Sequence, residues 1–170
     1  LKPNCRIVVV DQITEGAACT ALLAKEHINN NSMLLIANSD QYIEWNVSEV
    51  MYSLMKPNID GGILCFNSNH PKWSYVLEKN NRIIEVAEKK PISNLATVGI
   101  YYWRKGSEFV KFAEEMISKN IRTNNEFYIC PVFNEAIKSK KRIEKRMIKK
   151  MYGLGTPEDL DYFLKKFDNI

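Results

Sequence analysis

The sequence lacks the features of a membrane or secreted protein. No apolar run approaches the length of a membrane span, and the first residues show no signal-peptide pattern. There is no Cys-x-x-Cys pair and there are only two histidines, so a structural zinc site is not expected. The four cysteines lie far apart, mostly in apolar contexts: Cys5, Cys19, Cys65 and Cys130. We therefore expect four buried free thiols in a reducing cytoplasm.

The sequence also has no internal repeat, low-complexity tract or interdomain linker. Its 170 residues suit a single domain, residues 1–170, whose core is large enough to be stable without disulfides or metals. The net charge of +4 is mild, and much of it comes from residues 138–150. A solvated lysine-rich face is the favoured interpretation of that stretch, ahead of a polyanion site. Neither a nucleic acid nor a membrane is therefore expected as a partner.

The hydrophobic pattern predicts alternating strands and helices with an inserted hairpin. Strands are expected at residues 6–10, 33–37, 61–67, 96–103 and 147–152, and hairpin strands at 73–78 and 82–87. Helices are expected at residues 17–28, 47–56, 108–119 and 131–137, and from Thr156 onward. This order favours an α/β domain with three αβα layers and a mostly parallel, mixed sheet.

The strand-like run at residues 33–37 ends in Asn38, Ser39 and Asp40. An apolar run of this length suits a strand that is buried on both faces of a parallel sheet. A carboxylate just beyond it lies at the carboxyl edge of the sheet, where open α/β folds bind ligands. An exposed carboxylate there is a natural Mg²⁺ ligand beside nucleotide phosphates. The alternative is that Asp40 caps the next turn, because Asn, Ser and Asp are common loop residues.

Two further segments carry residues suited to phosphates or nucleotides. The run Glu88-Lys89-Lys90-Pro91 follows an expected strand, and a lysine there reaches a phosphate as a compact point charge. The acid before it holds the amine or a substrate hydroxyl. Residues 14–18 form a strand-to-helix turn, whose free backbone N–H groups take an anion or the edge of a base. Taken singly, the first segment is equally consistent with a solvated loop and the second with a tightly packed turn.

Together these segments resemble the sugar-phosphate nucleotidyltransferase family, also called nucleoside-diphosphate-sugar pyrophosphorylases. Residues 14–18 resemble the family's nucleobase-side loop, and residues 38–40 resemble the strand end whose aspartate binds Mg²⁺. Residues 88–91 resemble its Glu-Lys-Pro segment, whose lysine holds the acceptor phosphate. Residues 96–102 resemble the strand that lines the sugar pocket, and residues 155–160 a common closing signature. The segments occur in the family's order, and the resemblance covers essentially the whole chain.

The resemblance implies a Rossmann-like nucleotidyltransferase fold and an enzyme that uses Mg²⁺. Such an enzyme joins the nucleotide of an NTP to a phosphorylated sugar or similar small molecule and releases pyrophosphate, here for surface polysaccharide or capsule biosynthesis. Its partners are the NTP, the phosphorylated acceptor and, in a homo-oligomer, further copies of the chain. The implied site residues are Asp40 and Lys89 for catalysis; Asn38, Glu88, Thr97 and Gly99 for the substrate; Gly16 and Ala17 for the nucleotide; and Asp40 and Glu126 for the metal.

The sequence departs from this family in two ways. The glycine-rich loop that wraps the triphosphate, with its arginine and lysine, is absent. We therefore expect that roughly a strand-helix-strand-helix unit is missing, and that this N-terminally truncated domain is the carboxyl two-thirds of a longer enzyme. A second metal-binding aspartate, which many members carry near residues 124–131, is also absent. Asn125 or Glu126 takes its place, or Glu126 is an ordinary cap or surface acid.

Two other functions stay open at the level of sequence. A GT-A-like glycosyltransferase would carry a metal-binding Asp-x-Asp motif, and residues 38–40 offer only one acid. A catalytically silent, nucleotide-binding fragment would explain the absent triphosphate loop. The polar and aromatic segment at residues 70–75 is expected to border the acceptor, unless Trp73 and Tyr75 are ordinary core aromatics of a strand.

Overall fold

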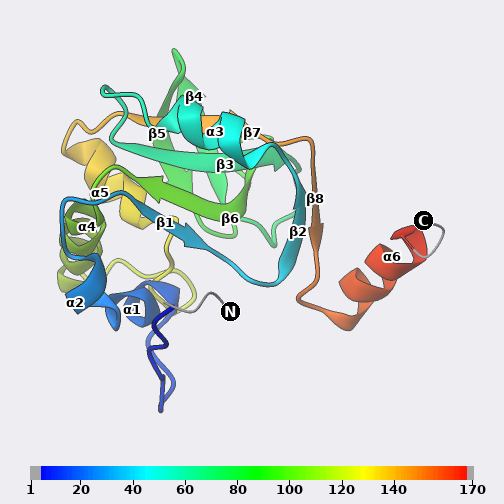
Figure 1. The fold of residues 1–170 in the computed structure, drawn as a ribbon, viewed down its shortest axis with the longest axis horizontal. Helices are drawn as coiled ribbons and strands as arrows, with labels where there is room; N and C mark the ends of the chain where they lie inside the picture. Colours follow the sequence, from blue (N-terminus) through cyan, green and yellow to red (C-terminus); the bar gives the residue numbers. More distant parts are fainter. Residues whose placement is uncertain (1–4, 168–170) are drawn as a thin grey trace.

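A computed structural model describes residues 5–167 of the chain. The strands of its central sheet are β1 (Leu34–Ala37), β3 (Gly61–Asn67), β4 (Tyr75–Lys79), β5 (Arg82–Ala87), β6 (Leu95–Trp103) and β7 (Ile143–Met147). They follow the order β5-β4-β6-β3-β7, and β1 pairs with the last residues of β6 (Figure 1). The predicted strands at 33–37, 61–67 and 96–103 and the predicted hairpin are thus confirmed. The strand at 33–37, however, pairs antiparallel with β6 and has Leu35 42% exposed, so it is not buried on both faces of a parallel sheet.

The sheet is mixed, as expected, but its hydrogen-bonded pairs are mostly antiparallel. Strands β1, β3 and β4 all pair antiparallel with β6, and β4 pairs antiparallel with β5. Among the described strands, β3 and β7 form the one parallel pair. Strands β1, β3, β4 and β7 run in the same direction, yet β6 runs against them from the middle of the sheet. The expectation of a mostly parallel sheet is corrected on this point, because strand order is set by long-range pairing.

Helices cover both faces of the sheet, which confirms the three layers. Helices α4 (Gly106–Ser118) and α5 (Val132–Lys138) pack on one face, and α3 (Val47–Leu54) packs on the other (Figure 1). Strand β6 is buried on both sides because its residues alternate between the two cores. Trp103 stacks on Phe133 of α5, with ring centroids 4.2 Å apart. Its neighbour Tyr102 points to the core that contains Leu54 of α3.

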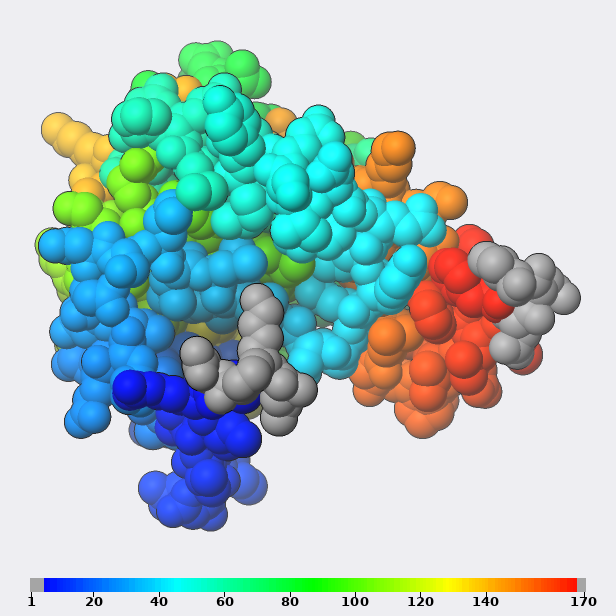
Figure 2. Space-filling view, in the orientation of Figure 1, coloured from blue at the N-terminus to red at the C-terminus, as the bar shows by residue number. Residues whose placement is uncertain are grey.

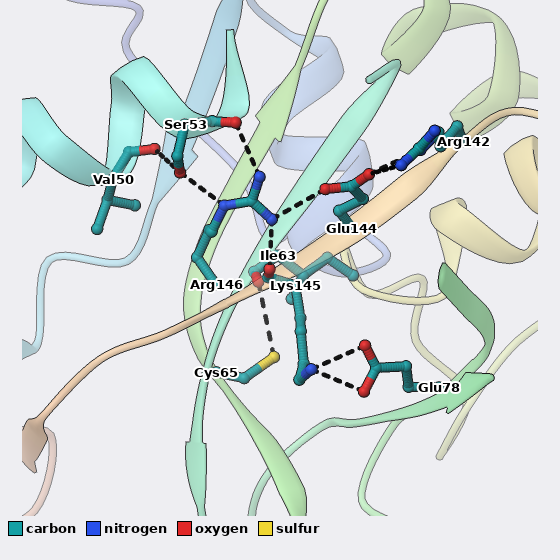
Figure 3. A network of polar contacts seen from close by, with 9 residues as sticks. All are labelled: Val50, Ser53, Ile63, Cys65, Glu78, Arg142, Glu144, Lys145 and Arg146. Carbon is teal, nitrogen blue, oxygen red and sulfur yellow. Dashed lines mark hydrogen bonds and ion pairs between the residues drawn. The ribbon is translucent and has the colours of Figure 1, made fainter. Parts of the chain in front are cut away.

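Strand β7 lies inside the lysine-rich stretch, and its basic side chains form ion pairs with acidic side chains. Lys145 Nζ lies 2.7 Å from both carboxylate oxygens of Glu78 (Figure 3). Arg146 donates from Nε to Ser53 Oγ at 2.6 Å and pairs with Glu144 at 3.1 Å. Charged groups that are half-buried on a strand need such partners. The predicted solvated face holds for the exposed lysines of this stretch, Lys138, Lys140, Lys149 and Lys150, whereas β7 itself is a partly buried strand. The charge pairing along β7 argues against a polyanion site on that strand.

A small second sheet stands beside the main one. Strands β2 (Gln41–Glu44) and β8 (Lys150–Gly153) pair antiparallel, and α6 (Pro157–Phe167) packs on them. The contact is aromatic: Tyr42 lies 5.3 Å from Phe163 and 5.6 Å from Phe167, between ring centroids. Helix α6 projects from the body of the molecule (Figure 2). The sequence predicted the final helix and the strand around 147–152, and it missed β2.

The expected strand at residues 6–10 is not formed. This segment has irregular backbone, and Ile7 and Val9 are 74% and 75% exposed. It protrudes from the molecule in the space-filling view (Figure 2). A run of β-branched residues becomes a strand only where a neighbouring strand takes its backbone hydrogen bonds, and residues 5–167 supply none to it.

Two smaller differences separate the structure from the sequence-based predictions. The expected helix at 17–28 is divided into α1 (Ala17–Leu22) and α2 (Lys25–Ile28). All four cysteines are free, but Cys5 is exposed and Cys19 is half-buried, so the expectation of four buried thiols holds for Cys65 and Cys130. Within residues 5–167, no helix has the length and apolar character that a membrane span requires.

Candidate active site

A cavity of about 290 Å³ opens where β6 meets the ends of β5 and α1. Six of the residues predicted to form the site line it: Ala17, Asn38, Glu88, Lys89, Thr97 and Gly99. These residues come from four separate stretches of the chain. Their convergence on one cavity is therefore a result of the fold and not of proximity in sequence.

The cavity wall is built around a close contact between Asn38 and Gly99. Asn38 follows β1 and donates its backbone N–H to the Gly99 carbonyl oxygen at 3.0 Å. Gly99 has φ +73, and a Cβ there would lie 2.4 Å from Asn38 Nδ2. Only glycine suits this position, because the backbone has a positive φ and a side chain would collide with Asn38. The predicted sugar-side strand and the predicted metal-side loop are thereby held together.

Asp40 lines a second cavity of about 200 Å³. This second cavity shares Asn38, Gln41, Lys72 and Trp73 with the first, so the two are neighbours. The Asp40 carbonyl oxygen accepts a hydrogen bond from Leu154 N at 2.8 Å. A Cβ at Gly155 would lie only 2.6 Å from Asp40 Oδ2. The closing segment of the sequence thus borders Asp40, and its glycine leaves room for the carboxylate.

Across the second cavity, Lys72 and Asp159 form an ion pair at 3.1 Å. Asp159 lies in the first turn of α6, where its N–H donates to Thr156 Oγ1 at 3.2 Å, the cap that the sequence predicted. Lys72 also lies 4.7 Å from the centre of the Trp73 ring. Lys72 and Trp73 line both cavities, whereas Asp159 lines the second cavity and not the first.

Glu88 stands at the floor of the larger cavity. Ser74 is 8% exposed and donates its hydroxyl to the Glu88 carboxylate. Burial raises the pKa of Glu88, and the Ser74 hydrogen bond and the Lys89 charge partly offset that rise. Beside it, the hydroxyls of Thr97 and Tyr101 lie 3.2 Å apart. Such a floor suits a neutral, hydroxyl-bearing ligand group, because a buried acceptor gains most from a hydrogen-bond donor.

Lys89 adopts a backbone conformation that is uncommon for residues other than glycine. Its φ is +53, and its N–H donates to the Trp73 carbonyl oxygen at 3.1 Å. Its ammonium donates to Tyr128 Oη at 2.7 Å and lies 4.8 Å from the centre of that ring. The next residue, Lys90, is exposed and does not line either cavity. The cavity therefore receives one lysine of the pair.

The residues present fit a magnesium ion that is shared with a ligand, rather than a closed protein cage. In the described part of the chain, no hydrogen bond or ion pair engages the Asp40 carboxylate. Glu126, by contrast, accepts a hydrogen bond from the Tyr128 hydroxyl and lines neither cavity. Residues 5–167 contain no cluster of three or more His, Cys, Asp or Glu arranged for a metal. Mg²⁺ commonly binds through one or two carboxylates together with substrate phosphates. Asp40 can supply one such carboxylate.

The two residues predicted to bind the nucleotide have different surroundings. Ala17 lines the larger cavity, whereas Gly16 packs against the backbone of Phe127. Gly16 has φ +122, and a Cβ there would lie 2.6 Å from Phe127 N. The N–H of Ala18, the second residue of α1, donates to the Phe127 carbonyl oxygen at 2.9 Å. The helix start is thus already occupied in part by the protein's own backbone.

Comparison with known proteins identifies the fold. No protein-family model matches the sequence, and neither does any curated protein. Among solved structures, a nucleoside-diphosphate-sugar pyrophosphorylase from Vibrio cholerae RC9 matches with a TM-score of 0.75 and 23% identity, over 92% of this chain and 67% of that one. A UDP-glucose pyrophosphorylase complexed with UDP-glucose matches with a TM-score of 0.72 and 21% identity, over 93% of this chain and 65% of that one. The chain has the nucleotidyltransferase fold.

A third match is a Bacillus anthracis structure assigned as a glucose-1-phosphate thymidylyltransferase, in complex with a sucrose. Its TM-score is 0.71 and its identity 17%, over 94% of this chain and 64% of that one. The chain thus spans about two thirds of the length of these structures. This extent agrees with the expectation of a truncated nucleotidyltransferase fold. At such low identity the similarity establishes the fold alone.

The fold also places at the two cavities residues that the sequence analysis did not single out. Gln41 lines both cavities, and Tyr128 contacts Lys89. No local pattern distinguished either residue from loop or strand neighbours.

The segment at 70–75 was expected to border the acceptor. Trp73 does line the cavity, whereas Tyr75 is fully buried in the sheet.

Proposed function

We propose that the protein to which this chain belongs transfers a nucleotidyl group. It joins the nucleotide of an NTP to a phosphorylated sugar or similar small molecule and releases pyrophosphate. One observation carries the proposal: Glu88, Lys89 and Asn38 converge on one cavity, and Asp40 lines the cavity next to it. They do so in a fold shared with two structures whose names state pyrophosphorylase activity.

The reaction is an in-line displacement at phosphorus. An oxygen of the acceptor phosphate attacks the α-phosphorus of the NTP, a new P–O bond forms, and the bond to pyrophosphate breaks. No covalent intermediate with the protein is required, so the protein acts by positioning the phosphates and stabilising their charge. Lys89 binds the acceptor phosphate, and Glu88 accepts a hydrogen bond from an acceptor hydroxyl. Asp40 would hold Mg²⁺, which supplies charge neutralisation at the phosphates when bound.

Surface polysaccharide or capsule biosynthesis in the cytoplasm is the setting we propose for this reaction. Activated sugars are the building blocks of such polymers, and the polar floor formed by Ser74, Glu88 and Thr97 suits a hydroxyl-rich acceptor. The runner-up is a catalytically silent nucleotide-binding fragment. It is favoured by the fact that the chain spans about two thirds of its structural neighbours and has no glycine-rich triphosphate loop.

Calorimetry on the 170-residue chain tests the binding part of this proposal. The titrants are CTP, UTP, dTTP and GTP with Mg²⁺, and separately a panel of hexose 1-phosphates. We expect at least one phosphosugar to bind. We also expect it to bind more weakly to the Lys89→Ala variant than to the Lys90→Ala variant. Binding of nucleotides without any phosphosugar would favour the silent fragment. Pyrophosphate release by the full-length parent, over the same panel, then identifies the nucleotide and the acceptor.

A further inference from the structure

Lys89 is long and flexible, so its position in the cavity needs an explanation. Its backbone is fixed by a left-handed conformation and by the hydrogen bond from its N–H to Trp73 O. The four-carbon stem beyond Cα can still adopt many rotamers, and ordering it costs conformational entropy. The side chain is exposed, so burial does not select one rotamer. Its hydrogen bond and ring contact with Tyr128 are the features that hold the ammonium in place.

Tyr128 is well suited to hold another group because it lies on an anchored segment. Its neighbours Phe127 and Ile129 are 1% and 7% exposed, respectively. Phe127 N donates to the Glu15 carbonyl oxygen at 2.8 Å, and the guanidinium of Arg122 lies 3.9 Å from the centre of the Phe127 ring. The tyrosine ring therefore extends into the cavity from a fixed piece of backbone.

The direction of the hydrogen bonds gives Glu126 a part in this arrangement. The Lys89 ammonium donates to Tyr128 Oη, and the Tyr128 hydroxyl donates in turn to the Glu126 carboxylate. With its hydrogen directed at Glu126, the phenol oxygen keeps its lone pairs available for Lys89, and the two bonds strengthen each other. An ammonium has three N–H donors, so this arrangement leaves two for a ligand.

We propose that Tyr128, oriented by Glu126, is a positioning residue that presents the Lys89 ammonium to the phosphate of the acceptor. This inference rests on the proposed function, because it assumes that Lys89 binds that phosphate. It also gives Glu126 a role at the acceptor side, in place of the expected one as a metal ligand. The Tyr128 hydrogen bond raises the pKa of Lys89, and the charges of Glu88 and Glu126 act in the same direction. The ammonium therefore stays charged.

The first test needs no ligand. Competitive acetylation across a pH series, read by mass spectrometry, reports the reactivity of Lys89 and of its exposed neighbour Lys90 in the same molecule. Tyr128→Phe keeps the ring and removes the hydroxyl, so the pKa of Lys89 should fall and its acetylation should rise at a given pH. Glu126→Ala should shift Lys89 in the same direction, and Lys90 should not change. Unchanged Lys89 reactivity in Tyr128→Phe would overturn the inference.

The second test is a double-mutant cycle read by calorimetry with inorganic phosphate and glucose 1-phosphate as probes. Tyr128→Phe should weaken binding of both probes roughly three- to tenfold, the range for losing one hydrogen bond. In the Lys89→Ala background the same change should have no further effect, because Tyr128 acts through Lys89. An equal loss in both backgrounds would mean that Tyr128 binds the phosphate directly, and would overturn the inference.

The cycle also separates this inference from the proposed function. If Lys89→Ala leaves phosphate binding unchanged, the proposed role of Lys89 is wrong and the positioning role falls with it. If Lys89→Ala weakens binding and Tyr128→Phe does not, the proposed function stands and only the positioning role is overturned. Thermal unfolding of each variant shows whether a loss of binding comes from loss of the fold.

Discussion

At the scale of single residues, Asp40 has the surroundings of a ligand-binding carboxylate. It is exposed, it lines a cavity, and a glycine at position 155 leaves space beside one of its oxygens. A residue that served only as a turn cap would direct its side chain at nearby backbone N–H groups. Within residues 5–167, no such hydrogen bond reaches the Asp40 carboxylate, and its backbone carbonyl makes the structural contact instead.

Asp40→Asn in the full-length parent should therefore separate activity from stability. The change preserves size and removes the charge proposed to hold Mg²⁺. We expect turnover to fall about 10²-fold or more, the scale of losing one preorganised electrostatic group. The thermal unfolding temperature should not change, because the Leu154 hydrogen bond uses the backbone. Pyrophosphate release measures the first quantity, and near-normal turnover would exclude Asp40 as the metal ligand.

Lys89 and Lys90 form a matched pair for the acceptor side. Lys89→Ala in the parent should raise the acceptor KM or lower kcat and leave binding of the free nucleotide almost unchanged. Lys90→Ala should be close to neutral, because Lys90 is exposed and lines neither cavity. Steady-state kinetics with the acceptor varied gives the comparison. Equal effects of the two changes would mean that the segment is only a charged loop.

At the scale of elements, α4 and α5 are joined by a buried acid. Glu135 of α5 is 2% exposed and pairs with Lys119 at the end of α4 and with Lys138 on its own helix. Burial alone would raise the pKa of Glu135, but the hydrogen bonds from both lysines hold it below its usual range. A carboxyl whose pKa is lower in the folded state stabilises the fold above its unfolded pKa, about 4.3. That stabilisation is lost as the pH falls through the folded value.

Glu135→Gln should accordingly flatten the acid limb of the stability profile. The amide keeps the shape of the side chain and cannot titrate. Wild type should lose more unfolding free energy than Glu135→Gln between about pH 6 and pH 3, because only the wild-type carboxyl must be protonated. Urea unfolding at a series of pH values measures both proteins. Parallel profiles for the two would show that this pair does not contribute to the pH dependence.

At the scale of the whole molecule, we propose that the extent of the chain limits the reaction it can carry out alone. It spans about two thirds of its structural neighbours and lacks the glycine-rich loop that resembling enzymes use for the triphosphate. In the proposed reaction, charge on the departing pyrophosphate would be poorly compensated without those backbone N–H groups and cations. We expect the 170-residue chain to show no nucleotidyl transfer with Mg²⁺ and substrates. A rate comparable to that of the full-length parent would contradict this.

The exposed apolar segment at residues 6–10 should make the isolated chain self-associate. Ile7 and Val9 are largely exposed, and within the described residues β1 pairs with β6 alone, so its second edge is open. Exposed strand edges and β-branched runs favour pairing between copies. Val9→Lys should lower the associated fraction in analytical ultracentrifugation without changing the unfolding temperature. The same association in Val9→Lys would place the contact elsewhere.

Most individual elements could be predicted from the sequence because their signals are local. The hairpin turn uses Asn80 and Asn81, which adopt φ of 52 and 59, a left-handed conformation that asparagine tolerates. The start of α6 follows from Thr156 and Pro157, a cap and a first-turn residue. The resemblance in five short segments was enough to name the fold, and it supplied six residues that do line one cavity.

What only the tertiary structure decided depends on contacts between residues far apart in the chain. The run at 6–10 is as β-branched as any true strand, yet it has no partner among the described residues and stays irregular. Residues 143–147 of the lysine-rich run become β7 because β3 pairs with them, and Glu78 and Ser53, distant in sequence, bind their charged side chains. No local sequence pattern marks Tyr128 as a site residue. It matters because the fold brings its hydroxyl oxygen to 2.7 Å from the Lys89 ammonium nitrogen. Local sequence sets backbone preference, whereas the pairing of strands, charges and site residues is settled only when the whole chain packs.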